Sequence, residues 1–377
     1  MLPLEGVKVL DLSRVLAGPY ATMVLADLGA DVVKVEHPER GDDTRHWGPP
    51  FAGGEAAYFL SVNRNKRSIG VDLKTQEGLE RIKRLAAAAD VLIENLRRGA
   101  LEKLGLGYDD LKELNPDLIY CSVTGFGPGV DRERPGYDFL IQARAGIMGI
   151  TGFPDGEPTK VGVAIADIVC GLHAATAILA ALHRREISGE GARIEVRLFE
   201  STLSWLANRA QEYLVSGEDT GRMGNAHPTI VPYQTFDASD KTFAVAVGND
   251  AQFKRLCGAI GREDLAEDGR YATNPERVAN REELVEILQR ELLGRTADEW
   301  IEKIRSAGVP CGPVNSLAEA LSDAHLSSTD MLQEVEHPVA GTLEMLASPV
   351  LVDGERPQIR RPPPTLGQHT EELRDWE

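Results

Sequence analysis

Cysteine is scarce in this 377-residue chain, and its four cysteines, Cys121, Cys170, Cys257 and Cys311, lie far apart. They therefore form no CxxC motif of a zinc or redox site. A chain of this length buries a sufficient apolar core without disulfides. We expect reduced and mostly buried thiols, which are typical of a cytoplasmic protein.

Long apolar runs and an excess of positive charge are also missing. No apolar run comes near the ~18 residues that a membrane span needs. Residues 1–5 show no basic region ahead of an apolar core, so we expect no secretory signal. The 41 basic and 59 acidic residues give a net charge of −18. Since such a surface repels nucleic acid and anionic membranes, we expect neither as a partner.

Motifs for common cofactors are absent. The chain has no GxxxxGKS/T phosphate loop and no HExxH zinc helix, and its histidines lack the spacing of metal ligands. Residues 125–129 read GFGPG, which is not the GxGxxG dinucleotide motif, because the proline would interrupt the helix that must follow. We expect no metal and no tightly bound cofactor.

The first third of the chain alternates between strand and helix patterns. Short apolar runs at 7–12, 31–35, 91–93 and 118–123 predict strands, and helical spacing occurs between them. This alternation predicts an α/β fold with a mostly parallel sheet covered by helices. Ligands of such sheets bind beyond the carboxyl ends of the strands.

A smaller α+β domain is predicted further along the chain. The segment 216–229 is rich in Gly, Asp and Asn and indicates a domain boundary. A hairpin is expected over 233–247. Helical patterns then follow at 251–260, 281–293 and 297–307.

One carboxylate stands out from its surroundings. Asp167 is a lone acid in the apolar run 161–171, directly before a long helical stripe that continues to Leu182. Its position favours a helix N-cap, a role that Asp often takes. A poorly solvated carboxylate there can also act as a covalent nucleophile, and a helix N-terminus stabilises its charge.

Residues 60–104 are locally basic, with ten basic residues against six acidic ones. Arg81, Lys83 and Arg84 are expected on a solvated helix face. Arg64, Lys66 and Arg67 are expected in a loop before a strand, and Arg97 and Arg98 follow another strand. These strand ends are where a phosphorylated ligand would dock.

Ten stretches, spread in order over the whole chain, resemble the family III coenzyme A transferases. They are LDLSRVLAGPYATMVLADLGADVVKVEHP (10–38), NRNKRSIGVDLK (63–74), VLIENLRRGALEKLG (91–105), CSVTGFG (121–127), RPGYDFLIQARAGIMGITG (134–152), AIADIVCGLHAATAILAAL (164–182), GNAHPTIVPYQTF (224–236), AVGND (246–250), AGVPCGPV (307–314) and PPPTLGQHT (362–370).

The resemblance implies a CoA-transferase whose nucleophile is Asp167. That carboxylate would take CoA from an acyl-CoA donor as an aspartyl-CoA thioester and pass it to a carboxylic acid acceptor. Acyl-CoA, coenzyme A and small carboxylic acids would then be substrates.

The resemblance also implies which residues surround the substrates. The CoA contacts it implies are Ala17, His37, Val71, Asp72, Leu73, Lys74, Asn95, Leu96, Arg97, Lys103 and Tyr137. Leu16, Gly248 and Asn249 are expected at the acyl pocket. Leu16 replaces a glutamine of formyl-CoA transferase, and residues 247–250 replace its glycine-rich loop, which favours a dicarboxylate such as succinyl-CoA.

Architecture follows from the resemblance as well. It implies a large Rossmann-like CoA-binding domain, a smaller α+β domain and an interlocked homodimer. The large domain is expected to span 1–215 with 325–377, and the small domain 225–315. Extended linkers are expected at 216–224 and 316–324.

Two alternatives stay open. One is a 2-methylacyl-CoA racemase of the same fold, although Tyr137 stands where a racemase has its basic histidine, and tyrosine is a poor base near neutral pH. The other is a noncatalytic acyl-CoA binding protein. The roles of Asn225, His227 and Tyr233 at the acceptor pocket or in the fold stay open too.

Overall fold

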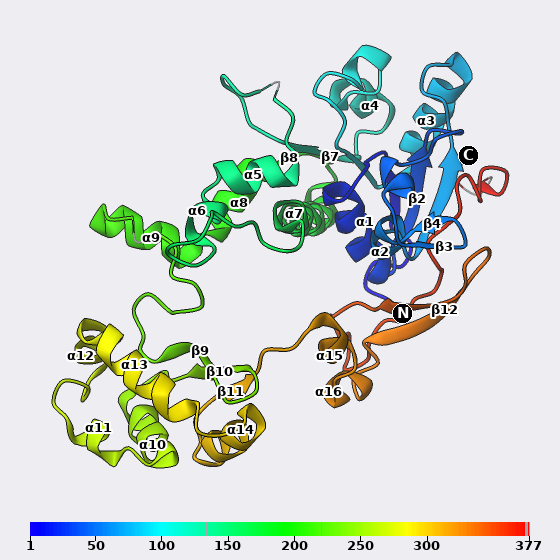
Figure 1. Cartoon of the computed structure of the whole chain (residues 1–377). Coiled ribbons are helices and arrows are strands. Elements are labelled where there is room, and N and C mark those ends of the chain that lie inside the picture. Colours follow the sequence, from blue (N-terminus) through cyan, green and yellow to red (C-terminus); the bar gives the residue numbers. More distant parts are fainter. Residues whose placement is uncertain (133, 220, 374–375, 377) are drawn as a thin grey trace. The chain divides into compact units, whose positions relative to one another are not determined.

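Six parallel strands form the central sheet of the larger of two units (Figure 1). The structure is a computed structural model that describes residues 1–132, 134–219, 221–373 and 376. The larger unit comprises 1–147, 160–211 and 324–377, and the smaller comprises 148–159 and 212–323. The strands, in their order across the sheet, are β5 (Lys66–Gly70), β2 (Asp31–Glu36), β1 (Lys8–Asp11), β6 (Val91–Glu94), β7 (Ile119–Thr124) and β8 (Ala192–Arg197).

Successive strand residues point to opposite faces of the sheet, and both faces are buried. Val9 and Val32 belong to the apolar core on one face, whereas Leu10 and Val33 belong to the core on the other. Strands covered on both sides read as continuous apolar runs rather than as an alternation. This explains why the sequence pattern predicted β1, β2, β6 and β7.

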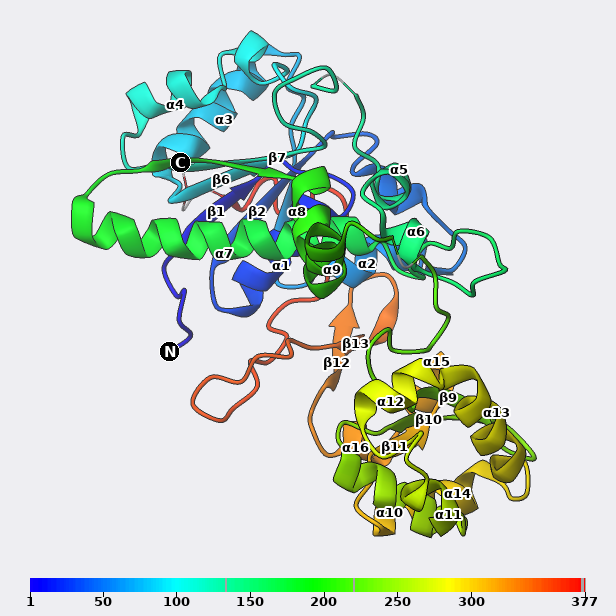
Figure 2. The same cartoon turned by 90° about the vertical axis from the view of Figure 1, so that its left-hand side faces the viewer.

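Helices α1 (Ala17–Asp27) and α7 (Ile165–Ser188) cover one face, and α3 (Gln76–Ala88) and α4 (Tyr108–Leu114) cover the other (Figure 2). This architecture confirms the predicted α/β fold with a parallel sheet.

Helix α7 is longer and more apolar than the sequence analysis allowed for. Its 24 residues are enough, by length and composition alone, to cross a membrane. Half of its most apolar stretch is buried inside the protein, including Ala174 and Ile178 in the core against the sheet. The core helix of a soluble protein meets the same criteria.

Strand β5 corrects the interpretation of the basic cluster, because it begins at Lys66 and so includes two residues expected in the loop before it. Its sequence, KRSIG, lacks an apolar run, yet it pairs with β2 at the edge of the sheet. Lys66 and Arg67 are buried in this strand, and Arg64 is buried just before it.

The end of the chain lies against the same edge. The backbone N–H of His369 donates to the Ser68 carbonyl, and the Trp376 indole donates to Asp31. Before it come helix α16 (Ala324–Ser327) and the antiparallel hairpin of β12 (Leu332–His337) and β13 (Gly341–Leu346).

The smaller unit packs helices on a three-stranded antiparallel sheet. The sheet order is β11 (Cys311–Pro313), β10 (Thr242–Ala246) and β9 (Tyr233–Asp237). The helices are α10 (Asp250–Ile260), α11 (Glu263–Glu267), α12 (Asn274–Ala279), α13 (Arg281–Leu292), α14 (Ala297–Ser306) and α15 (Leu317–Leu321). Phe243, Phe253 and Trp300 lie in its core.

The short elements complete the two units. In the larger unit these are β3 (Phe51–Ala52), β4 (Glu55–Ala56), α2 (Ala57–Val62), α5 (Asp138–Arg144), α8 (Leu198–Trp205) and the 3-10 turns at Asp43–His46 and Glu102–Leu104. Helices α6 (Ile147–Ile150) and α9 (Ala207–Ser216) lie where the chain passes between units.

The unit boundaries differ from the expected ones in two places. Residues 148–159 belong to the smaller unit, which also begins at Glu212 rather than after 224. The segment 316–324 is not an extended linker, because α15 forms there behind a Ser316 cap whose hydroxyl accepts the Glu319 N–H.

Candidate active site

Asp167 lies in the first turn of α7 but does not cap it. The N-cap residue is Ala164, which offers no side-chain acceptor. Instead Asp138, at the start of α5, accepts the backbone N–H of Ala166 at 2.8 Å through Oδ1. The expected N-cap role of Asp167 is therefore wrong, because a carboxylate from another helix takes its place and leaves the Asp167 side chain free.

A second residue of α5, Gln142, also holds the segment that leads into α7. Gln142 donates to the other Asp138 oxygen at 2.8 Å, and its own amide oxygen accepts the Val161 N–H at 2.9 Å. Gln142 is fully buried. Helix α5 thus holds the backbone at Val161 and at Ala166, on either side of Gly162. These two hydrogen bonds fix the position of the adjacent Asp167.

The Asp167 carboxylate has no hydrogen-bond or ion-pair partner within the described part of the chain. Burial, together with the nearby charge of Asp138, raises its pKa from 3.8 to about 7. The same surroundings raise the pKa of Tyr58 to about 12, through burial and the charges of Asp167 and Asp138. A poorly solvated, partnerless carboxylate is suited to nucleophilic attack.

Helices α7 and α1 approach closely one turn beyond Asp167. A Cβ built on Gly171 would lie 2.6 Å from the backbone oxygen of Ala17, which only glycine avoids. The first turn of α1 therefore lies next to the first turns of α7. The backbone N–H groups of Leu16 and Ala17 have no hydrogen-bond partner among the described residues.

A cavity of about 590 Å³ opens at the carboxyl ends of β1, β6 and β7. Seven of the residues named from the sequence line it, namely Leu16, Ala17, Asn95, Leu96, Arg97, Tyr137 and Asp167. Tyr137 is 63% exposed, so it is not the packed core aromatic that its position could also suggest. This location agrees with the rule for ligand sites in parallel sheets.

A second cavity, of about 290 Å³, lies beyond the carboxyl ends of β2 and β5. It is lined by His37, Val71, Asp72, Leu73 and Lys74 among the sequence-named residues. Arg14, Asp43 and Leu96 line both cavities, so the two share a border.

Three sequence-named residues lie in neither cavity. Lys103 lies in the 3-10 turn at Glu102–Leu104. Gly248 and Asn249 belong to the smaller unit, where Asn249 caps α10 by accepting the Gln252 N–H at 2.9 Å.

The residues left open have local partners in the smaller unit. Asn225 donates to the Thr235 hydroxyl at 3.0 Å, and the rings of His227 and Tyr233 pack with centroids 5.3 Å apart.

The basic cluster before β5 does not serve as a phosphate site. The Arg64 guanidinium pairs with Asp27 at 2.6 Å, Lys66 with Asp11 at 3.3 Å, and Arg67 with Asp31. The cations are buried beside acids, so their charges are neutralised within the fold. The docking interpretation of Arg64, Lys66 and Arg67 is wrong, whereas Arg97 does line the larger cavity.

Sequence reasoning missed several lining residues. The larger cavity is also lined by Arg14, Trp47, Arg132 and Arg134. Arg14 follows a strand, as does the loop of Arg132 and Arg134, so position after a strand was a usable signal. No local pattern marks Asp138, whose role depends on a residue 28 positions away.

Comparison with known proteins finds relatives that match along the whole chain. Residues 4–370 match the model of CoA-transferase family III. The chain is 46% identical to a succinate–glutarate CoA-transferase of Agrobacterium fabrum, covering 97% of this chain and 94% of that protein. It is 44% identical to the succinyl-CoA:glutarate CoA-transferase of Homo sapiens, over 98% and 84% of the two chains.

A solved structure is also similar along the whole chain. The crystal structure of a CAIB/BAIF family protein from Brucella suis has a TM-score of 0.89 and 46% identity, and each chain is covered completely. The named relatives are transferases, which favours transfer over the racemase and the noncatalytic alternatives. The chain therefore belongs to CoA-transferase family III and is a CoA-transferase that uses acyl-CoA substrates.

Proposed function

We propose that Asp167 is the nucleophile of this transferase. A carboxylate oxygen attacks the thioester carbonyl of the donor acyl-CoA, the C–S bond breaks, and CoA thiolate leaves a mixed anhydride. The thiolate then attacks the Asp167 carbonyl carbon, and the donor acid leaves as its carboxylate. The acceptor carboxylate reverses these steps and departs as acyl-CoA.

The observation that carries this proposal is the environment of Asp167. It is the one acid in the apolar run 161–171, it borders the larger cavity, and its carboxylate lacks a partner among the described residues. Burial that raises its pKa to about 7 leaves a large ionised fraction near neutral pH. Its ionised form is poorly stabilised in the free enzyme, which favours reaction with an electrophile.

The two bordering cavities suit the two ends of an acyl-CoA. In this proposal the nucleotide end binds at His37 and Val71–Lys74, and the pantetheine arm passes Asn95–Arg97 toward Ala17 and Tyr137. Lys74 and Arg40 line the smaller cavity and supply positive charge for phosphates. Lys103 lines neither cavity, so it would contact only a part of the nucleotide that reaches beyond them.

The substrate class that we propose is a pair of dicarboxylic acids, with succinyl-CoA as donor. The named relatives act on succinate and glutarate. Five arginines line the larger cavity of a chain whose net charge is −18. A second carboxylate on the acyl group is the chemistry that such a lining favours.

The oligomer that we propose is an interlocked homodimer. Helices α5, α7 and α8 contact one another and expose Phe139, Leu140, Leu172 and Leu203 at 39–55%. Exposed apolar side chains on adjoining helices are typical of a protein interface. Sedimentation at nanomolar concentration should show dimers, and monomers with native circular dichroism would contradict this proposal.

Intact-mass spectrometry tests the nucleophile. Incubation with succinyl-CoA should add a CoA-sized mass, and hydroxylamine should convert Asp167 to the hydroxamate. The Asp167→Ala protein should bind succinyl-CoA but form no adduct and show no turnover. Turnover by Asp167→Ala would overturn the covalent mechanism.

A further inference from the structure

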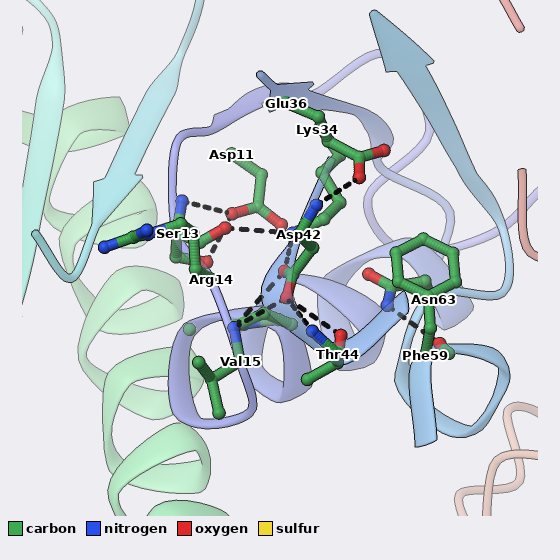
Figure 3. Close-up of polar contacts among 12 residues, drawn as sticks. Asp11, Ser13, Arg14, Val15, Lys34, Glu36, Asp42, Thr44, Phe59 and Asn63 are labelled. Atoms are coloured by element: carbon green, nitrogen blue, oxygen red, sulfur yellow. Dashed lines mark hydrogen bonds and ion pairs between the residues drawn. The ribbon is translucent and has the colours of Figure 1, made fainter. Parts of the chain in front are cut away.

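A buried charged cluster lies beside the loop that leads into α1 (Figure 3). Asp11, Lys34 and Lys66 are fully buried, and Asp42 is 1% exposed. Buried charges are costly unless they are paired and hydrogen-bonded. None of these four residues has been given a role in the reaction, so we asked what the cluster holds in place.

The loop above the cluster contains a strained residue. Val15 has a φ of 67°, in the left-handed region that β-branched residues rarely adopt. It directly precedes Leu16 and Ala17, which line the larger cavity and whose N–H groups have no partner among the described residues. Strain of this kind persists only where the surrounding structure enforces it.

Asp42 is the group that contacts the strained residue. Its two carboxylate oxygens accept the Val15 N–H at 3.3 and 3.2 Å. The same carboxylate accepts the N–H of Thr44 at 3.0 Å and its hydroxyl at 2.8 Å. Figure 3 shows Asp42 between Val15 and Lys34.

Lys34 connects Asp42 to a second point of the loop, at Ser13. Its ammonium pairs with Asp42 at 2.8 Å, with both side chains fully buried, and donates to the Ser13 carbonyl at 2.9 Å. Although burial opposes ionisation, Lys34 and the Thr44 donors lower the pKa of Asp42 to about 2. The pair is therefore charged over the whole pH range in which Asp167 titrates. It is hydrogen-bonded to the loop at Ser13 and at Val15.

We propose that Asp42 and Lys34 are positioning residues, which hold the strained Val15 backbone so that the Leu16 and Ala17 N–H groups are presented to the reacting carbonyl. This inference rests on Asp167 as the site of reaction. Two backbone N–H groups at that place would stabilise the oxyanion of each tetrahedral intermediate. The cluster would then act on the rate of the chemical steps through the loop. Lys34 and Asp42 also line the smaller cavity, but both side chains are fully buried.

A purely structural role makes a different prediction. A stabilising pair can lie anywhere in the core, and the Arg64–Asp27 pair is such a case at the other end of α1. Of these two pairs, it is Lys34–Asp42 that bonds to the loop beside the cavity, at Val15 and Ser13. The two pairs therefore form a matched comparison within one unit.

The experiment compares Asp42→Asn with the control Asp27→Asn, each below its unfolding temperature. We expect Asp42→Asn to lower kcat about 10- to 100-fold, as misplacement of catalytic groups does, while KM for succinyl-CoA changes by less than about 3-fold. Asp27→Asn should lose thermal stability and keep kcat within about 2-fold of the wild type. Equal kcat values in the two variants would overturn the inference.

Relief of the strain provides a second readout. Glycine adopts the left-handed region without penalty. In a Val15→Gly background the loop therefore needs the Asp42 hydrogen bonds less to keep this conformation. We expect Asp42→Asn to cost less than about 3-fold in kcat relative to Val15→Gly alone. The same loss of kcat in both backgrounds would contradict the positioning role.

A milder variant covers the case in which Asp42→Asn does not fold. Thr44→Val removes the hydroxyl donor to Asp42 and leaves the ion pair, and it should lower kcat about 3-fold. A folded Thr44→Val protein with wild-type kcat would count against the inference. If the wild type turns over without forming an Asp167 adduct, the covalent mechanism fails instead, so the two failures are distinguishable.

Discussion

Asp138 accepts the backbone N–H of Ala166 at 2.8 Å, and its charge adds to the raised pKa of the neighbouring Asp167. One carboxylate thus performs two tasks from a different helix. It replaces the missing N-cap of α7, and it makes the ionised form of the proposed nucleophile less stable. Both tasks can be tested.

The first prediction concerns pH. Because the nucleophile must be ionised and its pKa is about 7, kcat/KM should rise with pH through about 7 and level off above it. Asp138→Asn keeps an acceptor for the Ala166 N–H and removes the charge. Burial is the larger cause of the shift, so the rising limb should move only partly toward lower pH.

The measurement is the pH profile of kcat/KM for both proteins, from pH 5 to 9. Asp138→Ala is the matched variant that removes the acceptor as well. It should also lose kcat, by about 10-fold or more, because the start of α7 is no longer held. Superimposable profiles for wild type and Asp138→Asn would contradict the assigned cause.

The second prediction concerns stability at the same residue. The pKa of Asp167 is about 7 when folded and its ordinary value is 3.8, so ionisation opposes folding as pH rises between these values. Asp167→Asn cannot ionise. It should abolish turnover and raise the free energy of unfolding by about 1 to 3 kcal/mol at pH 8.

That gain should shrink as pH falls toward 4, because the folded-state carboxyl is then protonated and the unfolded-state carboxyl is close to its ordinary pKa of 3.8. Urea unfolding of both proteins at pH 5 and pH 8 measures it. A stability difference that is equal at the two pH values would show that Asp167 is not the group responsible.

The third prediction separates internal pairing from ligand binding among the cations. Arg64→Met breaks a buried pair with Asp27 and should cost about 3 to 5 kcal/mol of stability with no change in KM for acyl-CoA. Lys74→Ala alters an exposed cavity residue, so it should raise that KM about 10-fold and leave the unfolding temperature unchanged. Denaturation curves and steady-state kinetics on both variants measure these effects. A raised KM in Arg64→Met with a lost stability in Lys74→Ala would refute the roles assigned to the two residues.

The fourth prediction concerns the contact between α1 and α7. A Cβ at Gly171 would lie 2.6 Å from the Ala17 carbonyl oxygen, so Gly171→Ala must push the helices apart. It should cost about 1 to 3 kcal/mol and lower kcat, since Asp167 lies one turn away.

The control for that variant is Gly258→Ala, at an exposed position in the last turn of α10. No atom lies within 4 Å of a Cβ built there. It should stabilise the protein by about 0.5 to 1 kcal/mol and leave kcat unchanged, because alanine favours the helix. Similar losses in both variants would argue against steric contact as the cause.

The sequence by itself determined much of the architecture. Runs such as Val91–Ile93 and Leu118–Val123 predicted buried parallel strands, because a strand covered on both faces must be apolar throughout. Position after a strand placed Arg97 and Arg98 near the cavity, and the lone acid of an apolar run singled out Asp167. The ten matching stretches indicated the family that comparison establishes.

Only the tertiary structure decided which charges serve the fold. The sequence places Lys66 and Arg67 in a loop, whereas both lie buried in strand β5. Their burial is possible because partners up to 55 residues away, such as Asp11 for Lys66, neutralise these cations. Asp138 and Asp42 likewise act on distant segments, because they accept the backbone N–H groups of Ala166 and Val15. Local patterns record hydrophobicity and propensity, whereas the pairing of buried charges depends on contacts that exist only once distant segments have packed together.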